Sequence, residues 1–537
     1  MANNKYRHLL RTLLLPIELK NEKECSEELK VLLSDTAGAN FEEQANWLSN
    51  AISSWEEAGE PSRSLAKLIK QVVLVGSDQY GEIISENYFG VYNELISNQL
   101  AQNAQARSFL SHLLLITRLS VEERMSRAKI ARILDTLNPS AGFGRRSLAP
   151  IINKLKVGPN LTEENIKSLY EDDKFAAPAL FGDFSIEEAI EETGQVGLRL
   201  GTDISISDHL HALIDLTNLE KFSQYIQILH YQCSILEFCD HDVQDFYEFK
   251  PRGKAALWLF EQYPGSMVAA GNPFLNNAKS VSQVDFLWAS AKKNKEFPGA
   301  YALYSILSSL DNLGYAARKE VALWVRCLIH KLIEFADPHE IDLPDSLDNT
   351  IYKKVFENLA RTNTETRGIL EQRVVDAATS AINPESKGWV ARGIGDAVNA
   401  SNLSKKKLGD CDFQNLNLRR VSAYEAHGGD LTQTYINEHI RTLSKLFKSR
   451  IEEWSTFSSP QEWTVVITFI AHSISAELID SFEIEDVSVE ISYITYEDFF
   501  NLIEWERISE SLDTMILEPV NAKRTPLFVK ERFLSLM

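Results

Sequence analysis

The chain has 537 residues and carries 55 basic against 76 acidic side chains, a formal net charge of -21. This length suffices for roughly two to four domains with substantial hydrophobic cores. A charged fraction of 24%, without a long low-complexity tract, excludes a disordered or fibrous protein. The acidic balance excludes a surface that binds nucleic acid throughout, because phosphate contacts need clustered Lys and Arg. Any nucleic-acid site must therefore be local.

No stretch of the sequence is apolar enough to suggest a membrane span. The longest apolar runs, such as residues 463–471, are far shorter than the ~20 residues that a spanning helix requires. The apolar block at residues 13–17 is too short for a signal peptide and lacks a small-residue cleavage site. Five scattered cysteines are too few for a disulfide framework, which indicates reduced thiols. We therefore expect a cytoplasmic protein with no membrane partner.

The first 350 residues repeat apolar side chains at three- and four-residue spacing, which is typical of amphipathic helices. This spacing predicts helices over residues 41–57, 63–75, 86–115 and 316–335. Turn and cap residues such as Asn138-Pro139 separate such segments. No motif recurs at a fixed period, so we expect an irregular all-α region over residues 1–350 and not a helical repeat array.

One segment of this region, residues 127–156, has two short amphipathic stretches joined by a connection that contains Gly and Ser. The pattern is typical of a helix-turn-helix, in which Arg145 and Arg146 would begin the second helix and face DNA. Two ordinary packed helices give the same pattern, and we favour that interpretation.

Residues 230–241 contain two histidines and two cysteines, namely His230, Cys233, Cys239 and His241. His230 and Cys233 can share a helix face, but the other pair would require a bend within the apolar residues between them. This spacing is poor for zinc. We expect core cysteines and surface histidines instead.

The pattern changes after about residue 350, where helical segments alternate with strand-like ones. Spacing predicts a helix over residues 368–382 and a long amphipathic helix over residues 431–454. Composition and alternation predict strands over residues 419–427, 464–471 and 487–495. We therefore predict an α+β multidomain chain, in which a large all-α region precedes an α/β domain over residues 351–537.

Side chains that suit metal chemistry lie in the segment 409–429. Asp412 precedes Glu425 by 13 residues, and His427 follows on the same face of a strand as Glu425. If Asp412 ends the preceding strand of a hairpin, its carboxylate can meet that of Glu425 across the strand pair. Asp410 is the alternative first acid, since Asp410 and Asp412 could both approach one metal ion. Paired carboxylates form an oxygen-rich site for Mg²⁺, which can activate water for phosphodiester hydrolysis.

This element order and spacing resemble the PD-(D/E)xK nuclease superfamily, the fold of many restriction endonucleases, over about residues 365–505. The resemblance implies that Asp412 and Glu425 are the two catalytic acids and metal ligands, and that His427 occupies the position of the family's lysine. A histidine there can position or deprotonate the attacking water. Glu371 resembles the acid that many members carry on the helix before the hairpin.

Basic residues surround this candidate site, in contrast to the rest of the chain. Residues 361–450 contain 14 basic and 10 acidic side chains, a local balance of +4. Two basic groups lie where they could contact phosphates. They are Lys405, Lys406 and Lys407 before the first acid, and Arg419 and Arg420 on the hairpin. A solvated charged turn explains the lysine run equally well.

The resemblance implies an endonuclease that uses Mg²⁺ or Mn²⁺ to hydrolyse phosphodiester bonds, with DNA as the expected substrate, in restriction or anti-phage defence. The helical region would then recognise the target or bind protein partners of a defence system. A homodimer is expected by analogy with nucleases that cut both strands. Because His427 replaces the family's lysine, the alternative is a catalytically inactive nuclease-fold scaffold or nucleic-acid-binding subunit of a defence complex. A weaker alternative is a helical regulator that reads DNA through residues 127–156.

Overall fold

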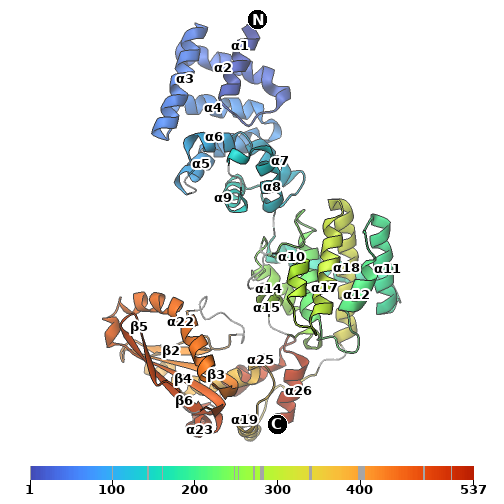
Figure 1. Cartoon of the computed structure of the whole chain (residues 1–537), viewed down its shortest axis with the longest axis vertical. Coiled ribbons are helices and arrows are strands. Elements are labelled where there is room, and N and C mark those ends of the chain that lie inside the picture. Colours follow the sequence, from blue (N-terminus) through green and yellow to red (C-terminus); the bar gives the residue numbers. More distant parts are fainter. Residues whose placement is uncertain are drawn as a thin grey trace. The chain divides into compact units, whose positions relative to one another are not determined.

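A computed structural model describes most of the chain as helices, followed by one mixed β-sheet (Figure 1). The described residues are 2–98, 101–141, 144–159, 161–246, 248–251, 253–269, 272–277, 283–337, 341–396, 406–475, 478–508 and 511–537. Within these ranges, every helix is too short or too polar to cross a membrane.

In the described residues, all helices from α1 to α20 precede the first strand, and further helices lie between and after the strands. The helices before the first strand are α1 (Ala2–Thr12), α2 (Glu22–Ala37), α3 (Phe41–Ala58), α4 (Arg63–Gly76), α5 (Gly81–Ser97), α6 (Asn103–Leu110), α7 (Leu113–Val121), α8 (Arg127–Leu137), α9 (Arg145–Leu155), α10 (Glu163–Phe181), α11 (Ile186–Leu200), α12 (Ile206–Leu213), α13 (Ser223–Ile235), α14 (Lys254–Glu261), α15 (Pro273–Asn277), α16 (Phe286–Ser290), α17 (Phe297–Asp311), α18 (Tyr315–Ala336), α19 (Asn349–Arg361) and α20 (Ile369–Ile382). The later helices are α22 (Gln433–Trp454), α23 (Tyr496–Asn501), α24 (Trp505–Ile508), α25 (Glu518–Asn521) and α26 (Leu527–Leu536). The strands are β1 (Trp389–Arg392), β2 (Cys411–Asn415), β3 (Arg420–Leu431), β4 (Thr464–Ile474), β5 (Ser481–Ile484) and β6 (Val487–Thr495).

The order of these elements confirms the expected α+β organisation, with helices first and a mixed sheet near the C-terminus. The predicted helices at residues 41–57, 63–75 and 316–335 correspond to α3, α4 and α18. The strands predicted at residues 464–471 and 487–495 correspond to β4 and β6. Apolar spacing therefore located these three helices and β6, and composition located β4.

The single helix predicted over residues 86–115 is wrong, because the structure divides this stretch among α5, α6 and α7. Asn98 is the C-cap residue that follows α5, and Gln102 is the N-cap residue that precedes α6 and forms a capping box with Gln105. Capping side chains of this kind satisfy the free backbone N–H groups of a new helix, and apolar spacing does not reveal them. Strands β1 and β5 also escape prediction, since four residues are too few to show a period.

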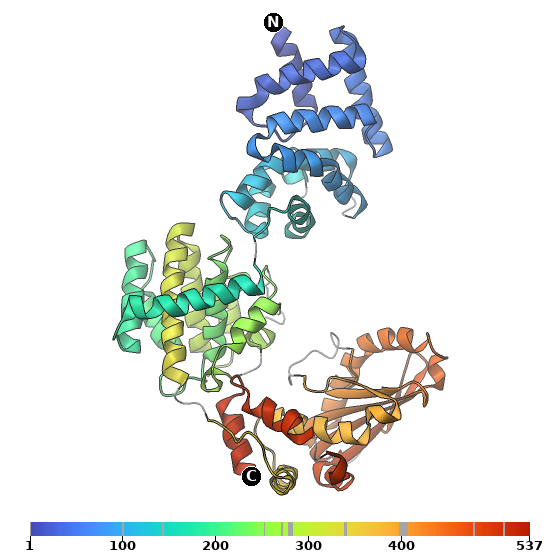
Figure 2. The same cartoon turned by 180° about the vertical axis from the view of Figure 1, so that it is seen from behind.

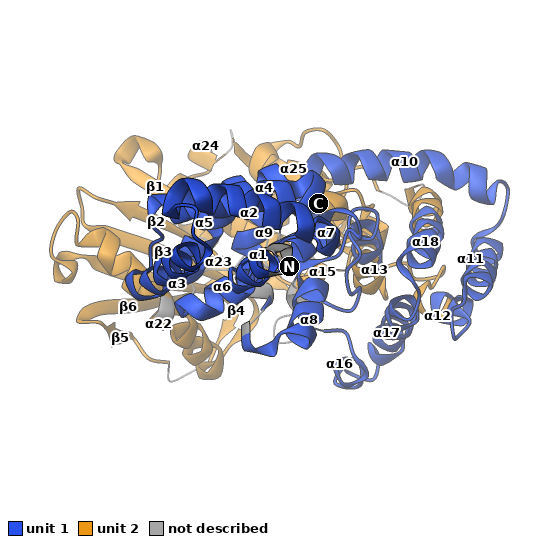
Figure 3. Ribbon diagram, turned by 90° about the horizontal axis from the view of Figure 1, so that it is seen from above, with its two compact units in different colours: residues 1–210, 229–256, 280–328 blue, residues 211–228, 257–279, 329–537 orange. Residues whose placement is uncertain are grey.

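The chain folds into two compact units (Figure 3). Unit 1 comprises residues 1–210, 229–256 and 280–328. Unit 2 comprises residues 211–228, 257–279 and 329–537. Two segments from the helical part of the sequence therefore belong to the same unit as the sheet.

Unit 1 combines apolar helix faces with a buried ion pair between distant helices. Arg326 of α18 donates hydrogen bonds of 2.7 and 3.2 Å to the two carboxylate oxygens of Asp173 on α10, and both side chains are buried. Such a pair satisfies two charges that could not be buried separately. Helices α8 and α9 bury Ile130, Leu134 and Leu148 in the unit's apolar core, as packed helices do.

The six strands of the described residues form one mixed sheet in unit 2, in the order β1-β2-β3-β4-β6-β5. Strands β1, β2 and β3 are antiparallel neighbours, whereas β3, β4 and β6 run parallel, and β5 is antiparallel to β6. Helix α22 lies in the crossover connection that two parallel strands, here β3 and β4, require. In the β2–β3 pair, Cys411 lies opposite Tyr424 and Asp412 lies opposite Ala423.

Helices cover both faces of this sheet (Figure 1, Figure 2). On one face, Leu443 and Phe447 of α22 share an apolar core with Val465 of β4. On the other face, Val374 of α20 shares a second core with Cys411 of β2 and with α19, α23 and α26. Because alternate side chains of a strand point to opposite faces, β3 and β4 contribute to both cores, with Val421 and Val465 on one face and Tyr424 and Ile470 on the other.

All five cysteines are free and buried. His230 and His241 are also buried, at 1% and 0% exposure, so the expectation of surface histidines is wrong. Nε2 of His241 lies 3.1 Å from Oε1 of Gln232, and burial lowers the pKa of His241 to about 3. A neutral imidazole with a polar partner is compatible with the core, which explains this placement.

Candidate functional site

A cavity of about 500 Å³ lies in unit 2, where the β2–β3 hairpin meets α22. Its wall contains three of the residues singled out by sequence, Asp410, Glu425 and His427. Carboxylates outnumber cations in this wall, since Glu365 joins the two acids while Arg367 is the one guanidinium among its described residues. The remaining lining residues are Asn363, Gly368, Ala426, Gly428 and Tyr435. This composition favours a cation as the occupant.

Asp410 reaches the pocket because the chain before β2 passes very close to β3. A Cβ atom at Gly409 would lie 2.4 Å from the carbonyl oxygen of Tyr424, so this approach requires glycine. Oδ2 of Asp410 then accepts a hydrogen bond of 2.9 Å from the backbone N–H of Ala426. Desolvation in the pocket wall, and then the negative charge of Glu425, raise the pKa of Asp410 well above its ordinary value.

Glu425 is held on its other side by α22. Oη of Tyr435 donates a hydrogen bond of 2.9 Å to Oε1 of Glu425, and Nδ1 of His439 lies 3.5 Å from the same oxygen. The other oxygen, Oε2, is buried and has no hydrogen-bond partner among the described residues. Burial acts to raise the pKa of Glu425, but the charge of His439 and the hydrogen bonds from His439 and Tyr435 lower it below its ordinary value. Glu425 is therefore an ionised carboxylate whose Oε2 has no hydrogen-bond partner among the described residues.

His427 is fixed by a ring contact and by a backbone carbonyl. Its imidazole packs against the ring of Tyr435 at a centroid separation of 4.2 Å. Nε2 lies 3.1 Å from the carbonyl oxygen of Asp430, just beyond the point where the β3–β4 pairing shifts register. A carbonyl oxygen only accepts, so Nε2 carries the hydrogen and a neutral ring keeps its lone pair on Nδ1.

Glu371 lies in the first turn of α20 and is fully buried. Its Oε1 accepts hydrogen bonds of 3.2 and 2.7 Å from the backbone N–H and hydroxyl of Thr364, and its Oε2 accepts one of 3.1 Å from the Thr366 hydroxyl. Oε1 would lie 3.7 Å from a Cβ atom at Gly428, so Glu371 borders the pocket without lining it. Its role is to hold the loop that supplies Asn363 and Glu365 to the pocket wall.

Asp412 does not meet Glu425, which corrects the pairing that the sequence suggested. Its side chain is fully buried, and Arg450 of α22 donates a hydrogen bond of 3.2 Å to Oδ1 while the backbone N–H of Leu408 donates one of 2.8 Å to Oδ2. The register explains this, because Asp412 lies opposite Ala423 and not opposite Glu425, while Asp410 precedes the first residue of β2. The acid that joins Glu425 in the pocket is therefore Asp410.

The basic residues near the site differ in what they can contact. Lys405 lies outside the described residues, and Lys406 is exposed. Lys407 is 1% exposed and donates a hydrogen bond of 2.8 Å to the carbonyl oxygen of Asp410, so it cannot contact a phosphate as the sequence suggested. Arg419 and Arg420 are both exposed. Arg420 begins β3, roughly 16 Å from Glu425 at ~3.3 Å per strand residue, and Arg419 precedes the strand.

Sequence reasoning missed Tyr435 and His439, the two α22 residues that hold Glu425. Burial opposes a charge on His439, but the carboxylate of Glu425 outweighs it and raises the pKa of His439 to about 9. The signal available in the sequence is their spacing of four residues on a predicted helix, which places both on one face. That spacing does not reveal which strand the face packs against.

The described residues contain no group of three or more His, Cys, Asp or Glu side chains arranged to hold a metal ion. Two carboxylates still suit Mg²⁺, which usually keeps several waters and is bound by one or two carboxylates together with substrate phosphates. The orphaned oxygen Oε2 of Glu425 beside Asp410 is the observation that fits such an ion. The pair Asp410 and Glu425 therefore fits a divalent cation.

Replacing Gly409 with alanine tests the close approach that places Asp410. The new Cβ atom would meet the Tyr424 carbonyl, so Gly409→Ala is expected to lower the free energy of unfolding by about 1–3 kcal/mol. Chemical denaturation measures this change. Gly314→Ala is the matched control, since nothing lies within 4 Å of a Cβ atom there. Equal stability of the two variants would contradict the close approach.

Asp376 of α20 gives the protein a pH-dependent stability. Burial is the main cause that raises its pKa from 3.8 to about 6, although Arg373 and the backbone N–H of Gly395 both donate hydrogen bonds to it. A raised acid pKa stabilises the fold below pH 4, and this contribution is lost as the pH rises through 6; the shift corresponds to about 3 kcal/mol. Between pH 4 and 7.5 the wild-type protein should therefore lose about 3 kcal/mol of unfolding free energy that Asp376→Asn does not lose. The difference in stability between the two proteins should shift by that amount in favour of the variant. Urea denaturation across this range checks it, and a constant difference would refute it.

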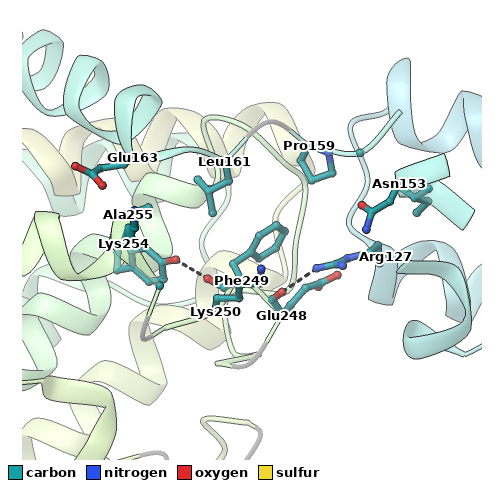
Figure 4. Close-up of a pocket in the computed structure, with 14 residues that line it drawn as sticks. Arg127, Asn153, Pro159, Leu161, Glu163, Glu248, Phe249, Lys250, Lys254 and Ala255 are labelled. Carbon is teal, nitrogen blue, oxygen red and sulfur yellow. Dashed lines mark hydrogen bonds between the residues drawn. The ribbon is translucent and has the colours of Figure 1, made fainter. Parts of the chain in front are cut away.

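A second cavity, of about 370 Å³, lies in unit 1 and includes residues of the predicted helix-turn-helix (Figure 4). Arg127, the first residue of α8, donates a hydrogen bond of 3.1 Å to the carbonyl oxygen of Glu248. The Glu248 carboxylate accepts a hydrogen bond of 2.8 Å from the backbone N–H of Ala128. The start of α8 is thus held by other protein groups. The side chains of Arg145 and Arg146 lie outside the described residues.

No model of a known protein family matches the chain, and no curated protein matches it significantly. A function must therefore be proposed from the chemistry of the pocket and from the order of the elements that build it.

Proposed function

We propose that the chain is a metal-dependent nuclease of the PD-(D/E)xK type, with Asp410 and Glu425 as its metal ligands. The unpaired oxygen Oε2 of Glu425, beside a second carboxylate in one pocket, carries the proposal. The order of the elements supports the proposal. Asp410 directly precedes β2, Glu425 lies on the antiparallel strand β3, and α22 connects β3 to the parallel strand β4. DNA as the substrate, and a role in restriction or anti-phage defence, rest on the resemblance of residues 365–505 to that superfamily.

The pocket residues divide the work of phosphodiester hydrolysis among them. When bound, Mg²⁺ or Mn²⁺ supplies a Lewis acid that neutralises charge on the phosphate and lowers the pKa of water. Asp410 and Glu425 hold this cation. His427 accepts the proton of the attacking water at Nδ1, because Nε2 is hydrogen-bonded to the Asp430 carbonyl. Packing against Tyr435 keeps the imidazole ring in place.

The experiment is a cleavage assay with the full chain. Supercoiled plasmid, single-stranded DNA and RNA are each incubated with the protein and Mg²⁺ or Mn²⁺, and chelator-treated samples serve as blanks. Nicked or linear plasmid is expected with metal and is not expected with Glu425→Gln. Cleavage that resists the chelator, or that persists in Glu425→Gln, would refute the proposal.

The second candidate is a nuclease fold that binds nucleic acid without cutting it. The observations that favour it are His427 in place of the family's lysine and the absence of a third metal-ligating side chain beside Asp410 and Glu425 in the described residues. Binding of DNA or RNA without cleavage under all metal conditions would support this candidate over the nuclease.

A further inference from the structure

Helix α22 presents two donors to the same oxygen of Glu425. Oη of Tyr435 lies 2.9 Å from Oε1, and Nδ1 of His439 lies 3.5 Å from it. The two residues are four positions apart, so they lie one above the other on the face of α22 that packs against the sheet. His439 is buried, and its ring contacts the ring of Phe469 on β4 at 5.3 Å. Both donors are therefore fixed by the packing of the helix.

His439 also contacts the segment that carries Asp410. Its Nε2 lies 3.2 Å from the carbonyl oxygen of Leu408, two residues before Asp410. The imidazole of His439 thus contacts both the segment that leads to Asp410 and the carboxylate of Glu425. Tyr435 makes a comparable double contact, since its hydroxyl holds Glu425 while its ring packs against His427.

We propose that Tyr435 and His439 are the positioning residues of the metal site, and that they hold Oε1 of Glu425 so that Oε2 alone faces the cation. This inference rests on the proposed function only in so far as Asp410 and Glu425 bind a divalent cation. Neither residue needs to touch the metal or the nucleic acid. Partners that orient a metal-ligating carboxylate typically change metal affinity or activity by ~10–100-fold when they are removed.

The first test measures the affinity of the full chain for Mn²⁺ alone by titration calorimetry. Tyr435→Phe removes the hydrogen bond to Glu425 and keeps the ring against His427, so it should weaken Mn²⁺ binding ~10-fold. Tyr352→Phe is the matched control. It removes a 2.6 Å hydrogen bond from a tyrosine hydroxyl to the carboxylate of Asp513, elsewhere in unit 2, and should leave Mn²⁺ affinity unchanged. Circular dichroism verifies that both variants fold.

The second test separates the two contacts of His439. His439→Asn keeps an amide N–H close to the position of Nδ1 and should retain Mn²⁺ affinity. His439→Gln places its amide N–H closer to the position of Nε2, loses the donor to Glu425 and should bind Mn²⁺ ~10-fold more weakly. In cleavage assays at saturating metal, Tyr435→Phe should lower kcat and leave the KM for nucleic acid unchanged.

The outcomes distinguish this inference from the proposed function. Wild-type affinity for Mn²⁺ in both Tyr435→Phe and His439→Gln, with binding abolished in Glu425→Gln, would overturn the positioning role and leave the nuclease intact. Weakened binding in these variants, in a protein that cleaves no nucleic acid, would support the positioning role while the nuclease fails. A wild-type protein that binds no Mn²⁺ would overturn both.

Discussion

Asp410→Asn is expected to abolish metal-dependent cleavage, by ~10³-fold or more. Loss of one of the two proposed carboxylate ligands should exceed the ~10–100-fold effect of losing an outer partner of a ligand. The amide oxygen of asparagine can still accept the hydrogen bond from the Ala426 backbone, so the loop before β2 keeps its place. Plasmid cleavage at saturating Mg²⁺ measures the effect.

The same substitution should not destabilise the protein. Desolvation and the charge of Glu425 raise the pKa of Asp410, so the ionised carboxylate opposes folding once the pH exceeds the raised pKa. Asp410→Asn removes this charge, and its free energy of unfolding at high pH should equal or exceed that of wild type. Cleavage at the wild-type rate by folded Asp410→Asn would refute the assignment of this residue as a metal ligand.

Asp412→Asn, two residues away, should destabilise the protein and leave cleavage intact. Burial raises the pKa of the Asp412 carboxyl and lowers that of the Arg450 guanidinium, and the charge of each partner opposes the other's shift. Each side chain therefore depends on the other to remain charged. Loss of the carboxylate removes the ion-pair partner of a fully buried guanidinium, which typically costs about 3–5 kcal/mol. Chemical denaturation of Asp410→Asn and Asp412→Asn under identical conditions measures the difference, and any Asp412→Asn that remains folded should still cleave.

A double variant controls for this interpretation. Replacing both members of a buried ion pair by apolar residues is often neutral or stabilising, because no charge is left unpaired. Asp412→Leu combined with Arg450→Met should therefore recover most of the stability that Asp412→Asn loses. Equal unfolding free energies for Asp410→Asn and Asp412→Asn would show that Arg450 does not depend on Asp412.

The helices and long strands could be predicted because their side chains repeat over many residues. Helix α22 and strand β6 were predicted from their periods and strand β4 from its composition, and the structure confirms all three. The breaks among α5, α6 and α7 depend on caps such as Gln102, and strands β1 and β5 depend on pairing with β2 and β6. Neither feature has a periodic signature, so neither could be predicted.

Periodicity and composition predict the organisation of this protein, with a helical region before an α/β domain and with two acids and a histidine in one hairpin segment. The resemblance favoured Asp412 over Asp410 as the first acid, because local sequence does not show that β2 begins at Cys411 and leaves Asp410 outside the strand. The tertiary structure decided, since Arg450, 38 residues further along the chain, pairs with Asp412 and leaves Asp410 to meet Glu425. The roles of Tyr435 and His439 were likewise decided by how α22 packs on the sheet. A buried charge acquires its partner only when distant segments pack together, and local sequence contains no record of that packing.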